Sequence, residues 1–167
     1  MLDAEIASIM KFLIDAAGNP GPYYYNIPEN FVVPAIYFPQ PEISTRGDTL
    51  KTYALEFSWF VKFFGKDTQS AQQMAFAVMT ALQRRKNVVP LIDAAGALTG
   101  RGFRMKDPSF RIADDGVVQM TLTWDSSRPY FEEEAQKITD LKINMRAKGA
   151  FDSAVTKAGG KNGRKKE

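Results

Sequence analysis

The sequence contains no cysteine and no histidine. Without cysteine, disulfides and thiolate metal sites are excluded, and a reducing compartment is the natural expectation. Without histidine, the chain lacks the commonest general base and the commonest zinc ligand, so neither a Ser-His-Asp nor a Cys-His site can be built from it. We therefore expect no catalytic, cofactor or metal site, and we expect the function to reside in the architecture of the fold.

Long hydrophobic runs are also missing. No stretch of about 18 apolar residues occurs, so no transmembrane helix and no membrane partner are predicted. The first residues, MLDAEIASIMKFL, begin with acidic rather than basic side chains and do not resemble a signal peptide. The 167 residues are 44% hydrophobic and 25% charged, which predicts one globular domain with a substantial core.

Positive charge is concentrated at the C-terminus. Residues 148–167 hold six basic and two acidic side chains, a net charge of +4, whereas the other 147 residues hold 16 basic and 17 acidic ones, a net charge of −1. A solvated tail is one interpretation of this segment. Contact with nucleic acid or another anionic surface is the other, and it would use the tail's last basic residues, Lys161, Arg164, Lys165 and Lys166.

Two segments have the periodicity of amphipathic helices. Residues 2–17 place apolar side chains on one side and end at Gly18, before two prolines. Residues 68–85 follow an N-cap at Asp67 or Thr68 and bear a core stripe of small and apolar side chains. Phe76 and Met79 fall on another side of this second helix, where they either extend the core or form a subunit interface.

The longest strand is predicted at residues 51–64, KTYALEFSWFVKFF. Side chains alternate between two faces along a strand, and one face here is strongly apolar. That core face consists of Tyr53, Leu55, Phe57, Trp59, Val61 and Phe63. The opposite face includes Phe60 and Phe64, which a neighbouring subunit would explain better than a monomer does.

A partner strand is predicted at residues 31–38, with Pro34 placing it at an edge or a bulge. Residues 39–50 then form a long polar connector, in which Arg46 and Asp48 flank a glycine turn. The resulting Arg-Gly-Asp tripeptide matches an integrin motif, but a charged turn is the better interpretation without signs of secretion. The tyrosines at residues 23–25 are either a short strand or a surface loop, covering the core or forming an interface.

A second hairpin is predicted from strands at 103–113 and 117–125, joined by an Asp-Asp-Gly turn. The turn accounts for Asp114 and Asp115, so they do not indicate paired catalytic carboxylates. Before this hairpin, residues 87–98 form a short apolar piece and 99–102 a turn. A third helix is predicted at about 130–147, capped near Ser127 or Arg128, with an apolar stripe of Phe131, Ala135, Ile138, Leu141 and Met145.

These elements predict an α+β fold. A four-stranded antiparallel sheet from two β-hairpins has two helices packed on one face, in the order α-β-β-α-β-β, followed by a C-terminal helix and a basic tail. The expected boundaries are 1–128 for the α+β domain, 129–147 for the helix and 148–167 for the tail. Because the open sheet face is half apolar, the fold is better suited to an assembly than to a monomer.

Over residues 2–128 the chain resembles the tail terminator (tail-completion) proteins of long-tailed bacteriophages. The resemblance rests on the N-terminal helix and on the segments PQPEISTRGDTL, KTYALEFSWFVKFF, SAQQMAFAVMTALQ and VVQMTLTWDSSRP. It implies a structural virion protein without an active site, assembled in the host cytoplasm. Such proteins form a ring, usually a hexamer, at the head-proximal end of the tail tube, where the ring ends tube polymerisation and joins the tail to the head connector.

The resemblance also implies partners and contact residues. The partners are further copies of the chain, the tail tube protein, the head-tail connector or neck protein, a sheath in some tails, and DNA that passes through the lumen without sequence specificity. The interface residues expected on this basis are Arg46, Asp48, Phe60, Phe64, Phe76, Met79, Phe131, Ile138, Leu141 and Met145.

Three alternatives stay open from the sequence. The first is another phage neck or head-tail connector component, which the sequence barely separates from a terminator. The second is a nucleic-acid-binding module that uses the basic tail, which the near-neutral body does not favour. The third is an enzyme with a carboxylate or lysine site, for which no group of residues can be assembled.

Overall fold

A computed structural model of the chain describes residues 2–131. They belong to one compact unit, Met1–Phe131. The predicted third helix, apart from its first two residues, and the basic tail therefore lie outside the described residues. Within them the chain forms two helices and eight strands: α1 (Leu2–Ala16), β1 (Gly21–Tyr24), β2 (Ala35–Phe38), β3 (Glu42–Gly47), β4 (Thr52–Phe64), α2 (Thr68–Arg84), β5 (Val88–Ile92), β6 (Leu98–Arg104), β7 (Ser109–Asp114) and β8 (Val117–Pro129).

The main sheet is mixed and has six strands rather than the four that we expected. Its order is β1-β2-β4-β8-β7, and β3 pairs with β4 as well. Strands β2 and β3 share one edge of β4, since β2 pairs with its last residues and β3 with its first half. Only the β1–β2 pair is parallel. The α+β class is confirmed, and β5 with β6 forms a separate two-stranded sheet.

The predicted connector at 39–50 is wrong, because half of it is strand β3. Its sequence, EISTRG, is polar and its residues are all exposed, so no apolar alternation marked it as a strand. The predicted strand at 31–38 is shorter and begins after Pro34. It is not an edge either, since β1, which contains Tyr23 and Tyr24, pairs with its other side. This places two of the three tyrosines in a short strand.

The predicted strand at 103–113 is divided between two sheets. Its beginning belongs to β6, which also includes the turn expected at 99–102, and its end is β7. Between them, Met105 forms a single bridge with Trp124, and Pro108 has no N–H to continue a ladder. Strand β8 also runs on to Pro129, so the residues expected to cap a third helix, Ser127 and Arg128, lie in a strand.

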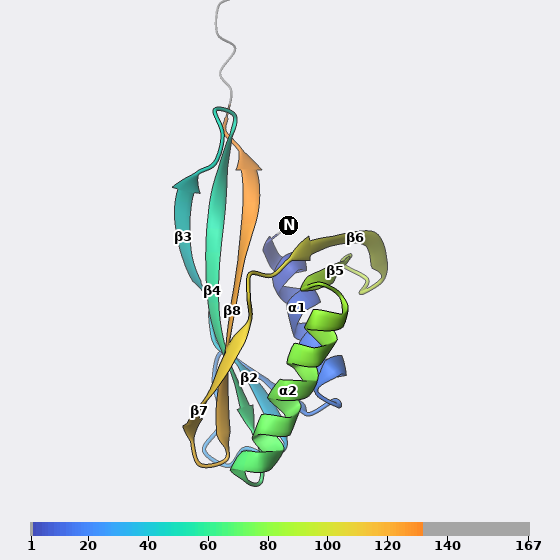
Figure 1. The fold of residues 1–167 in the computed structure, drawn as a ribbon, viewed down its shortest axis with the longest axis vertical. Coiled ribbons are helices and arrows are strands. Elements are labelled where there is room, and N and C mark those ends of the chain that lie inside the picture. The colour runs from blue at the N-terminus through green and yellow to red at the C-terminus, as the bar shows by residue number, and fades with distance from the viewer. Residues whose placement is uncertain (1, 132–167) are drawn as a thin grey trace, which may run out of the picture. The chain divides into compact units, whose positions relative to one another are not determined.

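The helices predicted at 2–17 and 68–85 are confirmed. The carboxylate of Asp67 accepts a hydrogen bond from the backbone N–H of Ser70, and the Ser70 hydroxyl reaches the Asp67 backbone in return, which completes a capping box at α2. Both helices cover the same face of the sheet, as Figure 1 shows. Their buried side chains are Ile9 and Leu13 from α1, and Ala71, Ala75, Val78 and Leu82 from α2.

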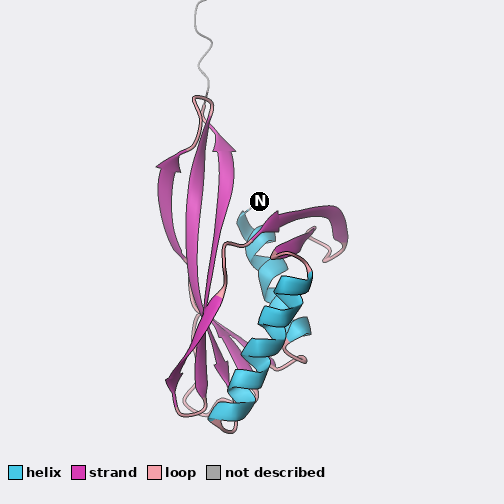
Figure 2. Cartoon of the chain, viewed as in Figure 1, coloured by secondary structure: helices cyan, strands magenta, loops and turns pink. Residues whose placement is uncertain are grey.

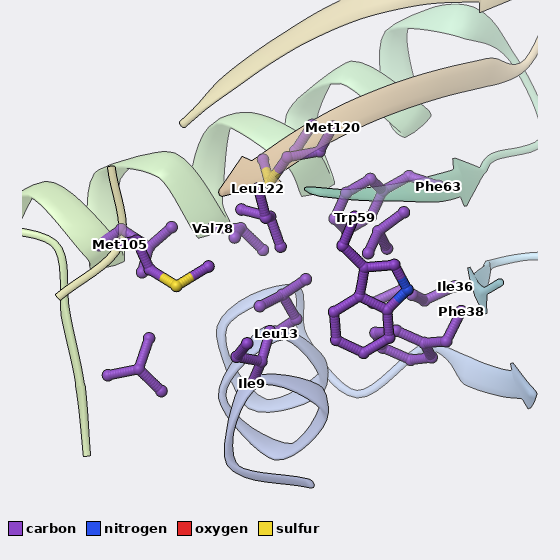
Figure 3. Close-up of a cluster of buried hydrophobic side chains, with 14 of the residues drawn as sticks. Ile9, Leu13, Ile36, Phe38, Trp59, Phe63, Val78, Met105, Met120 and Leu122 are labelled. Carbon is purple, nitrogen blue, oxygen red and sulfur yellow. The ribbon is translucent and has the colours of Figure 1, made fainter. Parts of the chain in front are cut away.

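The core lies between these helices and the central strands. Phe57, Trp59, Val61 and Phe63 of β4 are buried there, as the alternation predicted. Figure 3 shows the ring of Trp59 beside Phe38 and Ile36, with Leu13 of α1 on its other side. Tyr53, predicted for the same face, lies beyond the core and contacts Tyr130 instead, with ring centroids 5.4 Å apart.

One end of the sheet extends past the helices, as Figures 1 and 2 show. We call this part the sheet extension: β3, residues 52–56 of β4 and residues 125–129 of β8. The buried carboxylate of Glu5 joins its base to α1. It accepts hydrogen bonds from Trp124 Nε1 (3.2 Å) and Ser126 Oγ (2.7 Å), and Arg128 lies 3.8 Å away.

Candidate interaction surfaces

The acidic side chains of the β7–β8 turn and of the start of α2 have structural roles in the described part of the chain. Between residues 2 and 131, no group of three acidic side chains is placed to hold a metal ion. Asp115, in the turn between β7 and β8, accepts a hydrogen bond from Thr68 Oγ1 at 2.6 Å, which ties the turn to α2. The pKa of Asp67 is lowered, first by the backbone N–H of Ser70, as a helix cap requires.

The open face of the sheet bears a network of four charges. Arg46 Nε lies 2.7 Å from Glu56 Oε1, and Lys106 Nζ lies 2.7 Å from Asp125 Oδ1. Longer contacts of 3.4 Å and 3.9 Å cross-link the two pairs. The hydrogen bond to Glu56 is the main reason why the pKa of Arg46 is raised. Two positive and two negative groups leave this part of the face electrically balanced.

The interface residues predicted around this face have partners within the chain. Phe60 and Phe64 are half-buried, and the ring of Phe64 packs edge-on against Phe31 at 4.7 Å. Asp48, like Arg46, has an internal role, because it accepts hydrogen bonds from Thr52 Oγ1 (3.0 Å) and Ser127 Oγ (3.2 Å). These residues shape and order the open face before any partner binds.

An apolar surface lies where α2 meets β7. The side chain of Phe76 is 64% exposed, whereas Met79 is half-buried against the core. Phe76 and Phe110 line a groove of about 360 Å³ together with three glutamines and Ala77. Ile112 lies on the same face of β7 as Phe110, and its side chain is exposed like that of Phe76. Phe76 is thus available to a partner, while Met79 extends the core.

The tip of the sheet extension is a second apolar surface. Leu50 is fully exposed in the turn between β3 and β4, and Phe131 is 90% exposed just after β8. Phe131, expected near the start of the third helix, lies in neither a helix nor a strand. The other predicted contact residues, Ile138, Leu141, Met145, Lys161, Arg164, Lys165 and Lys166, lie outside the described part of the chain.

Two further features were missed by the sequence analysis. A groove of about 410 Å³ lies between α1, the end of α2 and the β5–β6 sheet, where Arg85 sits 5.9 Å above the ring of Phe12. Its lining mixes charged and apolar residues that are distant in sequence, so no local signal marked it. The second feature is a pair of free sheet edges at β3 and β7. The exposed strand β3 has no alternation of apolar and polar side chains, so neither the strand nor its free edge could be predicted from the sequence.

No protein-family model matches the chain. Over 147 residues, it is 30% identical to the phage-like element PBSX protein XkdJ of Bacillus subtilis (strain 168), an alignment that covers 88% of this chain and 100% of that protein. The chain belongs to the XkdJ family. It is also 31% identical over 139 residues to the uncharacterized protein YqbJ of the same strain, covering 83% of this chain and 94% of that protein.

Membership of the XkdJ family confirms the coarser part of the predicted resemblance, a relation to phage proteins. Among solved structures, one chain of the virion of native gene transfer agent (GTA) particle aligns with 78% of this chain and 95% of its own length. The identity is 12% and the TM-score 0.44, below the level at which a shared fold is assigned. No helix among residues 2–131 is long and apolar enough to cross a membrane.

Proposed function

We propose that the chain is a structural protein of a phage-type virion and that it acts as a tail terminator. In this role it forms a homo-oligomeric ring, of six copies by the resemblance, at the head-proximal end of the tail tube. The ring ends tube polymerisation and joins the tail to the head connector. The observation that carries the proposal is the alignment with XkdJ, a protein of the phage-like element PBSX, over the whole length of XkdJ.

The surfaces support an assembly role. Helices cover one face of the sheet, while the other face and two sheet edges are open to partners. The exposed apolar side chains include Phe76 on α2 and Leu50 at the tip of the sheet extension, which lie on separate surfaces. A ring subunit needs one surface for each neighbour and another for the tube or the connector, so separate contact surfaces suit it. It needs no reactive centre.

The proposed partners follow from this position in the particle. They are further copies of the chain, the tail tube protein and a neck or connector protein, with DNA passing through the lumen without sequence-specific contacts. The balanced charges of Arg46, Glu56, Lys106 and Asp125 suit an open face that meets other proteins. They give that face no local excess of positive charge for holding DNA.

The experiment combines the purified full-length chain with tail tubes assembled from the tube protein of the same element. We expect rings in native mass spectrometry, and in negative-stain images we expect them at one end of each tube. Tubes treated with the chain should stop growing when more tube protein is added. A chain that stays monomeric and never occurs at tube ends would refute the proposal. Rings that bind the connector but ignore tubes would identify another neck component.

A further inference from the structure

Strands β3 and β7 are free edges of the main sheet within the described residues. Each pairs with one neighbour, β3 with β4 and β7 with β8. On such a strand, alternate N–H and C=O groups point away from the sheet and are able to pair with another chain. The third edge, β1, has four residues, one of them Pro22, which has no N–H to donate. β3 and β7, with six residues each, are the better edges for pairing.

The directions of the two edges suit a ring. Strand β3 is antiparallel to β4, β4 to β8, and β8 to β7, so β3 runs antiparallel to β7 across the sheet. Ring neighbours are related by rotation about one axis, and such head-to-tail contacts join two different surfaces. An edge of β3 brought against β7 of the next copy would therefore meet it in antiparallel orientation, which is the stronger ladder.

We propose that β3 of one copy pairs with the free edge of β7 in the next copy, with Ser44 opposite Ser109. The sheet would then continue from subunit to subunit around the ring. This inference rests on the ring of the proposed function, and it names the surface and the register that build it.

Charge favours this register. It sets Glu42 opposite Arg111 of the next copy, on the same face of the continued sheet. Neither side chain has an ion-pair partner within residues 2–131, although both are exposed. It also sets Arg46 opposite Asp107, which would join the existing network of four charges. Opposite charges directly across two strands stabilise the pair, and like charges destabilise it.

The apolar side chains favour the same register. Ile43 is 49% exposed and lies on the helix-covered face of the sheet, as its pairing with buried Phe57 shows. In the proposed ladder it lies opposite Phe110 of the next copy, which is on that same face. Phe110 lines the groove that also holds the exposed ring of Phe76. Ile43 would therefore cover an apolar surface that has no cover within the described chain.

The two edges are offset along the strand direction by an amount that suits a closed ring. Ser44 is level with Glu56 of β4, and Ser109 is level, through Thr121, with Phe60 of β4. Each copy thus shifts the sheet by four residues along β4 while adding four strands across it. At about 3.3 Å per residue and about 4.8 Å per strand, the strands tilt by about 35° to the ring axis, within the range that closed sheets adopt.

The free edge ends just beyond the proposed ladder. The backbone N–H of Met105 donates to Asn87 O at 2.8 Å, so the chain before residue 106 is already bonded on its outer side. The proposed ladder pairs residues 42–44 with 109–111 of β7. It continues past Pro108, which precedes β7 and has no N–H to donate to Thr45, as far as Asp107. A register two residues farther along, with Ser44 opposite Arg111, would leave Glu42 opposite Ala113 and lose the charge pair.

Engineered disulfides test the register directly, because the full-length chain has no cysteine of its own. We expect the double variant Ser44→Cys/Ser109→Cys, oxidised after assembly, to give a ladder of covalent oligomers on a non-reducing gel. Directly opposite residues in an antiparallel pair have Cα atoms about 4.5 to 5.5 Å apart, which a disulfide spans. A one-to-one mixture of the two single variants should stop at dimers, and each single variant alone should stay monomeric.

The controls separate the pairing from the ring. The shifted pair Ser44→Cys/Arg111→Cys should give several-fold less of the ladder, and equal yields would refute the register. Dimers from Ser44→Cys alone would show that β3 pairs with itself, which also refutes the proposal. Rings in native mass spectrometry that do not cross-link would overturn the pairing alone. Absence of any oligomer, with or without tail tubes, would overturn the proposed function together with it.

A charge reversal gives an independent readout. Glu42→Arg places two positive charges opposite each other at every subunit contact, and we expect the concentration needed for rings to rise by about tenfold or more. The double variant Glu42→Arg/Arg111→Glu should restore assembly. Glu29→Arg, the same change at another exposed position, should leave it unaltered. Failure of the double reversal to recover rings, when both variants fold normally, would contradict the pairing.

Discussion

Replacement of Glu5 by alanine should strongly destabilise the fold. The carboxylate is buried, with 8% of the residue exposed, and it is the acceptor for Trp124 Nε1 and Ser126 Oγ. Without it, two buried donors of β8 have no acceptor at this place. Each buried polar group left without its hydrogen bond costs about 1 to 3 kcal/mol, so the loss of both acceptor contacts should lower the free energy of unfolding by about 2 to 6 kcal/mol.

Urea unfolding followed by tryptophan fluorescence measures this loss. With a slope of about 2 kcal/mol per M, a loss of about 3 kcal/mol lowers the midpoint by about 1.5 M. The chain has two tryptophans, both buried, and the indole of Trp59 donates to Pro39 O rather than to Glu5. A shift in the emission of the folded variant would therefore report on Trp124. The Glu5→Gln variant keeps one acceptor oxygen and should lose less, about 1 to 2 kcal/mol.

The matched control is Asp15→Ala, which removes an exposed carboxylate from the same helix. Its pair with Lys11 is 4.0 Å long and exposed, so the change should cost less than about 0.5 kcal/mol. If Glu5→Ala costs no more than Asp15→Ala, the buried carboxylate does not hold the sheet extension, and the reasoning fails.

Two further predictions concern α2. Leu82→Ala should cost about 2 to 5 kcal/mol, because Leu82 is fully buried, whereas Phe76→Ala should change stability by less than about 0.5 kcal/mol and yet weaken ring formation. Urea midpoints and native mass spectrometry on the same samples check both, and a large loss of stability in Phe76→Ala would show that the Phe76 side chain belongs to the core. Asp67→Ala should lower the urea midpoint at neutral pH. The pKa of Asp67 is lowered in the fold, so the stability contributed by its charge is complete above the ordinary carboxyl pKa and is lost as pH falls through the lowered value. The difference between the two midpoints should therefore shrink as the pH falls below the ordinary carboxyl range, and a difference that stays constant would contradict the contribution of the charged cap.

The elements that the sequence predicted well are long and periodic. Helices α1 and α2 and strand β4 each repeat a pattern over 13 to 17 residues, and the pattern exists because one face of each is buried. Strands β3 and β6 have no buried face, since nearly all of their residues are exposed. Backbone pairing alone holds them in the sheets, and pairing leaves no mark on side-chain periodicity. Polar strands of this kind look like loops in a single sequence.

The Glu5 site could have been found from spacing. Glu5, Ile9 and Leu13 follow one another at intervals of four, so the carboxylate lies on the buried stripe of α1. An acidic residue near a helix start is also accounted for by the helix dipole alone, so its position did not single it out as buried. The hydrogen bonds to Trp124 and Ser126 span 119 and 121 residues and could not be derived from local pattern.

Strand β4 connects the predictions about stability with those about assembly. It pairs with β8 over 13 consecutive residues without a bulge. Because β3 pairs with β4 and β7 pairs with β8, this one register fixes the offset between β3 and β7 along the strand direction. A slip of that register by two residues would change the stagger from four residues to two or six, and with it the tilt that closes the ring. Glu5 binds Trp124 and Ser126 of β8 at the base of the sheet extension, and these hydrogen bonds oppose such a slip. Glu5→Ala should therefore impair ring closure even at temperatures where the variant remains folded, a defect that its loss of stability alone would not produce.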